Sequence, residues 1–258
     1  MSTAPSKQTK ADTSRVKILT EKDVPKASRT LVKSFEEDSL AKLLTDHIDD
    51  LELKNQVEHT LYECYLKQHL EKGICLGIGE GIEEYETVAI WSTPTSIEDG
   101  LDSFDNLMYA GYGKLWEQVG EEGREKIFRG MLPLLHDTAE RILSTDSRFK
   151  GKGVYTLVYL GSVASARGKG NVRAMFDYMF HNYIDKPGTN NIAYLESSSS
   201  DNIPIYNRFG FVFYEDIMLG SNEDADAKEG EDYAIMNVMI RGSFGKDWSK
   251  DSNSEAKL

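Results

Sequence analysis

Apolar residues recur along most of the chain at the spacings that helices and strands require. Continuous or alternating apolar runs predict strands at residues 16–19, 74–79, 87–92, 154–163, 191–197, 211–219 and 233–241. Spacings of three and four predict helices over residues 23–35, 57–66, 103–145 and 171–183, and a short helix between residues 201 and 210. Because strands and helices alternate, the sequence predicts an α/β fold, with a mixed sheet of about seven strands and helices on both faces.

Capping residues mark the ends of two of these helices. Asp23 followed by Pro25 is typical of an N-cap with proline in the first turn. In the short helix, Asp201 or Asn202 is the expected cap, Pro204 lies in the first turn, and Gly210 ends the helix.

The two ends of the chain are poor in apolar residues, so residues 1–14 and 243–258 are expected to be disordered tails. Residues 15–242 are expected to form a single domain, which is long enough to bury a stable core without disulfides. The helical pattern over residues 101–150 interrupts the strands and predicts a helical insertion before the fourth strand.

The charge of the chain favours some partners over others. Its 258 residues include 30 Lys and Arg against 43 Asp and Glu, a formal net charge of −13. This balance disfavours nucleic acid as a partner and favours amines or basic peptides. No apolar run approaches the roughly 18 to 20 residues of a membrane span, and the polar start has no signal core. We therefore expect no membrane association and a cytoplasmic location, with the nucleus as the alternative.

The cysteines and histidines do not form a metal-like pattern. Cys64 falls in a helical pattern and Cys75 in an apolar run, which predicts two ordinary thiols rather than a disulfide or a zinc site. The histidines are His47, His59, His69, His136 and His181. Their spacing matches no metal-binding motif, so no metal is expected.

A loop with two glycines joins the longest predicted strand to an amphipathic helix. Gly168 and Gly170 free the backbone to turn, and the following helix start offers unpaired N–H groups and a positive dipole end. Such a junction can bind phosphate, although a tight connection without a ligand is an equal alternative. The spacing fits neither a P-loop nor GxGxxG.

Two segments resemble a known family. LGSVASARGKGNVRAM is similar to the acetyl-CoA signature of the GNAT superfamily of N-acetyltransferases, and YLESSSSDNIPIYNRFGF is similar to its Asn-x-x-x-Tyr-x-x-x-Gly-Phe block. With TVAIWSTPTSIEDG added, the likeness is closest to the puromycin N-acetyltransferase-like branch. The resemblance covers roughly residues 16–239. It implies the GNAT acyl-CoA N-acyltransferase fold and acetyl-CoA as co-substrate.

The resemblance also implies which residues contact acetyl-CoA. The backbone of residues 160–162 would bind the pantetheine arm, and the N–H groups of residues 168–173 would bind the pyrophosphate. The implied cofactor contacts are Leu160, Gly161, Ser162, Arg167, Gly168, Lys169, Gly170, Asn171, Val172, Arg173 and Asn202. Glycine at 161 would mark a bulge or a close backbone approach. The chain departs from the family at Ser162, Ala164 and Val172, where Val, Pro, and Gly or Ala are usual. Helical spacing turns the Val172 side chain toward the sheet.

Two residues are candidates for catalysis. The resemblance implies that Tyr206 protonates the departing CoA thiolate; the alternative is a tyrosine that packs on Phe209 and Phe211. Glu196 shares one strand face with Tyr194 and is our candidate base, with an ammonium anchor or a surface ion pair as alternatives.

The resemblance implies direct acetyl transfer, without a metal or a covalent enzyme intermediate, from acetyl-CoA to a primary amine, and we expect the amine to belong to a small molecule. Alternative functions are acetylation of a protein or peptide amine, and a catalytically weak CoA-binding module. Trp91 and Tyr85 would line the acceptor pocket or pack in the core. The expected partners are acetyl-CoA and the amine, and the expected state is a monomer or a homodimer.

Overall fold

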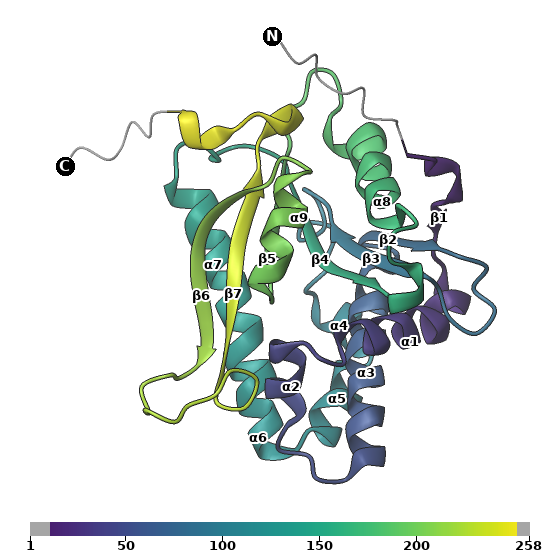
Figure 1. The fold of residues 1–258 in the computed structure, drawn as a ribbon, viewed down its shortest axis with the longest axis vertical. Coiled ribbons are helices and arrows are strands. Elements are labelled where there is room, and N and C mark those ends of the chain that lie inside the picture. The colour runs from purple at the N-terminus through teal and green to yellow at the C-terminus, as the bar shows by residue number, and fades with distance from the viewer. Residues whose placement is uncertain (1–10, 252–258) are drawn as a thin grey trace.

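The predicted strands form one mixed sheet, in the order β1-β2-β3-β4-β5-β7-β6 (Figure 1). The computed structural model describes residues 11–251. The strands are β1 (Lys17–Ile18), β2 (Gly73–Ile78), β3 (Thr87–Ser92), β4 (Val154–Ser162), β5 (Ile192–Ser197), β6 (Val212–Gly220) and β7 (Tyr233–Arg241). Strands β4 and β5 are parallel, and the other neighbouring pairs are antiparallel. The predicted fold class and all seven predicted strands are confirmed.

Helices cover both faces of this sheet (Figure 1). Within residues 11–251 the α-helices are α1 (Val24–Phe35), α2 (Ser39–Thr45), α3 (Leu51–Leu70), α4 (Phe104–Ala110), α5 (Tyr112–Gln118), α6 (Gly120–Arg124), α7 (Leu132–Thr145), α8 (Asn171–Met179) and α9 (Ile203–Asn207). Successive side chains of β3 point to opposite faces, as in any strand. Val88 and Ile90 pack with α1 and α3, whereas Ala89 and Trp91 pack with α8.

Strands β4 and β5 separate halfway along their length. Their pairing runs from Val154 opposite Ile192 to Leu157 opposite Leu195 and then stops. The register between β3 and β4 also shifts here, which leaves Val158 as a bulge. Among the described residues, none pairs with 158–162 on the β5 side, so the backbone groups of β4 on that side are open to a ligand.

The predicted helical insertion over residues 101–150 is several short helices rather than one. Gly111 (φ 105°) and Gly120 (φ 64°) have left-handed backbones, a conformation that glycine adopts without strain and that ends a helix. A π-helical segment, Glu125–Met131, then leads into α7. Because Ile127 and Met131 are buried in the main core, the insertion is an integral part of the domain.

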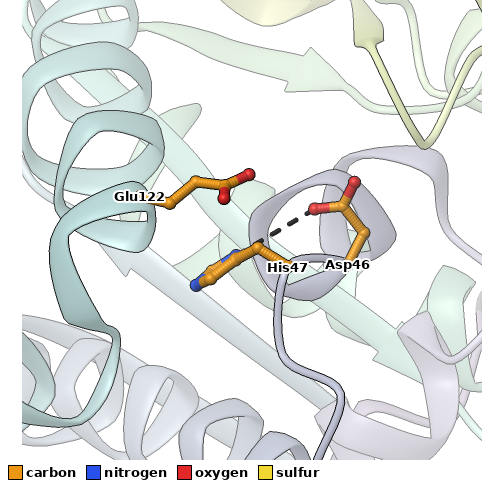
Figure 2. A group of neighbouring side chains, drawn as sticks. All are labelled: Asp46, His47 and Glu122. Carbon is orange, nitrogen blue, oxygen red and sulfur yellow. Dashed lines mark ion pairs between the residues drawn. The ribbon is translucent and has the colours of Figure 1, made fainter.

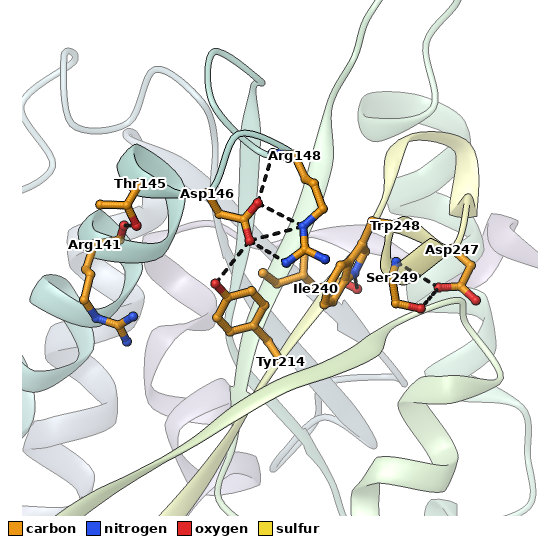
Figure 3. A network of polar contacts seen from close by, with 9 residues as sticks. All are labelled: Arg141, Thr145, Asp146, Arg148, Tyr214, Ile240, Asp247, Trp248 and Ser249. Carbon is orange, nitrogen blue, oxygen red and sulfur yellow. Dashed lines mark hydrogen bonds and ion pairs between the residues drawn. The ribbon is translucent and has the colours of Figure 1, made fainter. Parts of the chain in front are cut away.

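The predicted C-terminal tail is wrong for residues 243–251. Trp248 is only 6% exposed, and its ring packs edge-on against Phe149 with 5.2 Å between ring centroids. The Trp248 indole N–H donates a hydrogen bond to the Ile240 carbonyl oxygen at 2.7 Å (Figure 3). A single buried aromatic residue therefore fixes a segment whose composition is polar.

An ion pair supports the same corner of the molecule (Figure 3). The Arg148 guanidinium lies 4.6 Å from the Trp248 ring centroid and donates to the Asp146 carboxylate, to which the Tyr214 hydroxyl also donates. Burial opposes ionisation of Asp146, but the Arg148 bonds prevail and hold its pKa below the ordinary value. The predicted N-terminal tail is likewise wrong for residues 11–14, because Asp12 caps a short 3-10 helix, Thr13–Arg15. Residues 1–10 and 252–258 of the predicted tails lie outside the described residues.

Replacing Trp248 with alanine is expected to cost about 3 to 5 kcal/mol of folding free energy, the usual loss for a buried tryptophan. In a domain of this size the Tm should fall by on the order of 10 °C. Lys250→Ala is the control, because this side chain lies in the same segment and is 80% exposed. A thermal melt of both variants measures the difference, and equal Tm values would mean that residues 243–251 add nothing to stability.

Two local features predicted from the sequence are the cap of α1 and the state of the two cysteines. Asp23 is the N-cap residue of α1 and Pro25 lies in its first turn, as predicted, but the Asp23 carboxylate makes no capping bond to the helix. It accepts hydrogen bonds from the Thr20 N–H and the Tyr85 hydroxyl instead. Cys64 and Cys75 are both buried, and burial raises the pKa of each thiol to about 12.

Within residues 11–251, the helices are too short or too polar to cross a membrane.

Candidate functional site

A cavity of about 1250 Å³ lies where β4 and β5 separate. Its wall includes residues of α1, α3, β3, β4, β5 and α9 and of the helical insertion. Four of the residues singled out from the sequence line it: Leu160, Glu196, Asn202 and Tyr206. The fold therefore brings both catalytic candidates into one cavity, which is large enough for a small ligand and part of a second one.

Tyr206 belongs to α9, a helix of barely more than one turn whose Pro204 lies in the first turn. Its ring packs edge-on against Phe176 and Phe211, so the residue is held rigidly. Its hydroxyl has no hydrogen-bond partner among residues 11–251. Burial and the nearby Asp38 carboxylate raise the pKa of Tyr206 to about 12. The hydroxyl is thus a proton donor in the cavity wall.

Glu196 projects into the cavity from β5, whose backbone is paired with Val238 of β7. Burial raises the pKa of Glu196 to about 7, against the opposing effect of the Tyr194 hydroxyl. An unperturbed glutamate has a pKa near 4.3 and is a weak base for an amine. With a pKa near neutrality, Glu196 is matched to proton transfer at physiological pH.

The glycine loop places free N–H groups at the start of α8. Gly168 (φ 78°) and Gly170 (φ 75°) have left-handed backbones, so both positions require glycine. Ala174 makes the first helical bond, to the Gly170 carbonyl oxygen at 3.0 Å. In the described part of the chain, the N–H groups of Gly168 and of residues 170–173 have no acceptor. The resemblance implies that the Lys169 N–H is also free, but it donates a hydrogen bond to the Ala166 carbonyl oxygen at 3.3 Å.

Side chains of this loop are already bound within the protein. The Glu86 carboxylate forms an ion pair with the Lys169 ammonium at 2.8 Å. It also accepts a hydrogen bond from the Asn171 side-chain amide at 2.9 Å. Arg15 donates to Asn171 Oδ1 at 3.0 Å. Asn171 is 2% exposed, so its side chain fixes the loop to β3 and the N-terminal segment instead of facing a ligand. The loop therefore offers backbone N–H groups more than side chains.

The remaining predicted cofactor residues lie around this loop and β4. Gly161 is not the bulge but a position where β4 approaches α1 closely, because a Cβ atom here would come within 2.9 Å of Leu31 and Ser34. The Ser162 hydroxyl pairs with the Thr87 hydroxyl at 2.9 Å. Val172 is half-buried and packs against the α8 side of the core, as helical spacing predicts.

Two basic residues complete this set. Arg173 lies 5.2 Å from the Phe209 ring centroid. Arg167 is exposed, and its side chain has no partner within residues 11–251. Neither Gly161, Ser162 nor any residue of 167–173 lines the cavity.

Sequence reasoning missed a neutral histidine in the cavity wall. His69 is buried, and burial lowers its pKa to about 4. Its Nδ1 lies 2.7 Å from the Tyr65 carbonyl oxygen, which can only accept, so Nδ1 carries the proton. Its Nε2 lies 3.1 Å from the Ser92 hydroxyl and therefore accepts from it. Neither residue belongs to a local motif, so only the fold reveals this pair.

Asp38 was also missed. It caps α2 by accepting from the Ala41 N–H at 3.1 Å, and the Ser198 hydroxyl donates to its other oxygen. Burial raises the pKa of Asp38, and its charge acts on Tyr206. A helix-capping aspartate is so common that its position in the sequence gives no functional signal.

Trp91 and Tyr85 pack in the core, which was the alternative to a place in the acceptor pocket. Trp91 is 1% exposed and contacts Phe176 edge-on, and Tyr85 is 5% exposed. Neither lines the cavity.

One cluster of potential metal ligands, Asp46, His47 and Glu122, lies away from this cavity and joins α2 to α6 (Figure 2). The Lys126 ammonium pairs with both carboxylates, at 2.9 Å from Glu122. Because a lysine of the chain already neutralises these carboxylates, their pairing is explained as a structural ion-pair network.

The chain is similar to known proteins in sequence and in fold. No model of a known protein family matches the chain. It is 29% identical to an uncharacterized N-acetyltransferase of Schizosaccharomyces pombe over 198 residues. The matched segment covers 77% of this chain and 74% of that protein.

Solved structures share the fold. One is a histone acetyltransferase HPA2 and related acetyltransferase from Corynebacterium glutamicum, with a TM-score of 0.53, 19% identity, and coverage of 88% of this chain and 95% of that chain. Another is a polyamine N-acetyltransferase of Drosophila melanogaster, with a TM-score of 0.51, 10% identity, and coverage of 88% and 98%. The sequence relative and both structures are acetyltransferases, and this chain has the fold of the GNAT superfamily of N-acetyltransferases.

Proposed function

We propose that the chain is an acetyl-CoA-dependent N-acetyltransferase that transfers acetyl directly to the primary amine of a small molecule. The observation that carries this proposal is the cavity in which Glu196 and Tyr206 both lie, at the point where β4 and β5 separate. A base with a pKa of about 7 and a tyrosine hydroxyl that donates a proton are the two groups that the reaction needs.

The open backbone groups of β4 and of the glycine loop fit acetyl-CoA as the co-substrate. The unpaired side of β4 offers backbone groups to an amide-containing arm, and the free N–H groups at the start of α8 suit a pyrophosphate. Acetyl-CoA supplies the acetyl group and leaves as its thiol. Glu196 accepts the proton that the acceptor ammonium loses, which frees the nitrogen to form a bond to the acetyl carbon as the carbon–sulfur bond breaks. Tyr206 donates its hydroxyl proton to the departing sulfur and regains a proton from the second one that the nitrogen loses when it becomes an amide.

Acetyl-CoA is expected to raise the Tm of the protein, because a ligand at about 100 times its Kd stabilises the fold by about 2.7 kcal/mol. Gly170→Asp should remove this shift, since it adds a side chain at a left-handed position and a negative charge where phosphates would bind. Gly188→Asp is the matched control, a left-handed glycine in an exposed turn with open space around it. No shift with the unaltered protein at millimolar acetyl-CoA would refute the proposal.

A second assay, the release of free thiol from acetyl-CoA, separates the proposed function from a CoA-binding module. A CoA-binding module would show the thermal shift but would not release free thiol from acetyl-CoA in the presence of amines. An acetyltransferase shows both. We also propose, on the likeness of residues 87–100, 160–175 and 194–211, that the chain belongs to the puromycin N-acetyltransferase-like branch. The two free cysteines suit a reducing compartment, so we propose that it acts in the cytoplasm, with the nucleus as the alternative.

A further inference from the structure

One atom of the cluster formed by Asp46, His47 and Glu122 has no partner within residues 11–251. His47 Nδ1 is buried and makes no hydrogen bond, and the His47 side chain as a whole is only 9% exposed. Asp46 Oδ1 lies 4.0 Å from this nitrogen, which is too far for a hydrogen bond. Because a buried polar atom without a partner costs free energy, the ion pairs of the two carboxylates do not account for the whole cluster.

His47 presents a lone pair at this unpartnered position. Its Nε2 lies 3.0 Å from the Val119 carbonyl oxygen, which can only accept, so Nε2 carries the ring proton and Nδ1 does not. The ring packs closely on α6, because a Cβ at Gly123 would come within 2.9 Å of Nε2. A histidine that donates one ring N–H to a backbone carbonyl and presents its other nitrogen has the usual arrangement of a metal ligand.

Two carboxylates approach the same point from different elements (Figure 2). Asp46 is the C-cap residue of α2, and Glu122 lies on α6. An oxygen of each and the His47 nitrogen all lie within 4.8 Å of one another. Ligand atoms around a tetrahedral zinc ion are roughly 3 to 4 Å apart, so a contraction of about 1 Å would complete the set. Asp46 and Glu122 are exposed residues, so their side chains can make this movement while the His47 ring stays in place.

The Lys126 ammonium marks where a cation is held. It pairs with Asp46 and, at 2.9 Å, with Glu122, but it does not reach the His47 nitrogen. Its single positive charge compensates one of the two carboxylate charges. A divalent cation would compensate both and would also bind the ring nitrogen. Such an ion displaces the ammonium, which the long and flexible lysine side chain can carry into solvent.

We propose that Asp46, His47 and Glu122 form a binding site for a divalent metal ion of the zinc class, which joins α2 to the helical insertion. Mixed nitrogen and carboxylate ligation suits zinc, whereas magnesium and calcium prefer oxygen ligands throughout. The site lies outside the cavity, so the ion stabilises the fold and takes no part in acetyl transfer. This inference does not depend on the proposed function. The spacing of the histidines could not reveal the site, because Glu122 is distant from His47 in sequence.

The test is zinc binding to the full chain, without a histidine tag and after treatment with a chelator. Titration calorimetry with zinc chloride should detect binding at micromolar zinc. Zinc should also raise the Tm, because a ligand that binds only the folded state stabilises it. Magnesium chloride at the same concentration should do neither. Cobalt(II) is the spectroscopic probe, since its visible absorption becomes more intense when protein ligands replace most of its water.

Three variants connect zinc binding to the proposed ligands. His47→Gln should weaken it by about tenfold or more, because the nitrogen ligand is lost. Glu122→Gln should also weaken it, and this side chain is 61% exposed, so the variant remains informative if the His47 variant does not fold. Lys126→Gln should tighten zinc binding, since the competing ammonium is removed. A melt of each variant without metal confirms that it is folded.

His136→Gln is the matched control. His136, Asp137 and Glu140 form a second cluster of the same residue types, but all three are exposed and lie on α7 alone. Replacing His136 should therefore leave the affinity for zinc unchanged.

Four results would overturn the proposal. The first is that zinc produces neither heat nor a Tm shift in the unaltered chain. The second is that zinc binds equally well to the His47 and Glu122 variants. The third is that His136→Gln weakens binding as much as His47→Gln does. The fourth is weaker binding in Lys126→Gln, because the ion would then not take the place of the ammonium between the two carboxylates.

Discussion

Replacing Tyr206 with phenylalanine is expected to lower kcat by roughly 10²- to 10⁴-fold, the usual contribution of one catalytic acid. Acetyl-CoA binding should persist, because the ring that packs on Phe176 and Phe211 is kept and only the unpartnered hydroxyl is lost. Calorimetric titration with acetyl-CoA and turnover at saturating amine measure the two effects separately.

The raised pKa of Tyr206 makes this role demanding. A free thiol has a pKa near 8.5, so transfer from a tyrosine at about 12 to a fully solvated thiolate would be uphill by about 5 kcal/mol. A thiolate that forms in the same apolar cavity is also poorly solvated, which raises its pKa and narrows the gap. Because the site raises the pKa of Tyr206 instead of lowering it, the proposed proton transfer depends on a poorly solvated thiolate.

Tyr155→Phe is the matched control for this experiment. Tyr155 lies on β4, is half-buried on the α8 side of the core and does not line the cavity. If Tyr206→Phe and Tyr155→Phe both retain full turnover, Tyr206 is a packing residue and another group must protonate the thiolate.

The regular elements of this fold were predictable because each has a strong local pattern. The apolar, β-branched and aromatic run of residues 154–163 favours a strand, and the stripe through Met175 and Met179 favours a helix packed on the sheet. The residues lost from the prediction lacked such a pattern. Trp248 is one aromatic side chain in a polar segment, and Gly111 and Gly120 divide a helical pattern that apolar spacing alone leaves continuous.

The site was predictable only where a motif spans a few residues. The loop at 167–173 and the block around Tyr206 are each contiguous, so their likeness to a family could be read directly. The pKa of Glu196, the neutral state of His69 and the lining of the cavity arise from residues that are distant in sequence and meet only after folding. Burial sets each of these properties, and no short motif encodes burial.

Replacing Glu196 with glutamine should reduce kcat by about 10²-fold or more at pH 8 and should remove one step from the pH profile. With a pKa of about 7, Glu196 is mostly protonated at pH 6 and mostly ionised at pH 8. Only the ionised carboxylate can accept a proton, so the rate of the unaltered protein should rise as the pH increases through 7. In the glutamine variant this rise in rate disappears. Only the rise at higher pH, where the acceptor amine itself loses its proton, remains.

The split between kcat and KM distinguishes the two roles that sequence reasoning left open for Glu196. A base acts in the proton transfer, so its loss lowers kcat; an ammonium anchor acts in binding, so its loss raises KM and leaves kcat largely intact. Glu98→Gln is the control, since Glu98 is exposed, has no partner within residues 11–251 and does not line the cavity. A glutamine variant that keeps both kcat and the step near pH 7 would show that Glu196 is not the base and that another group accepts the proton of the acceptor amine, with Asp38, whose charge acts on Tyr206, as the next candidate.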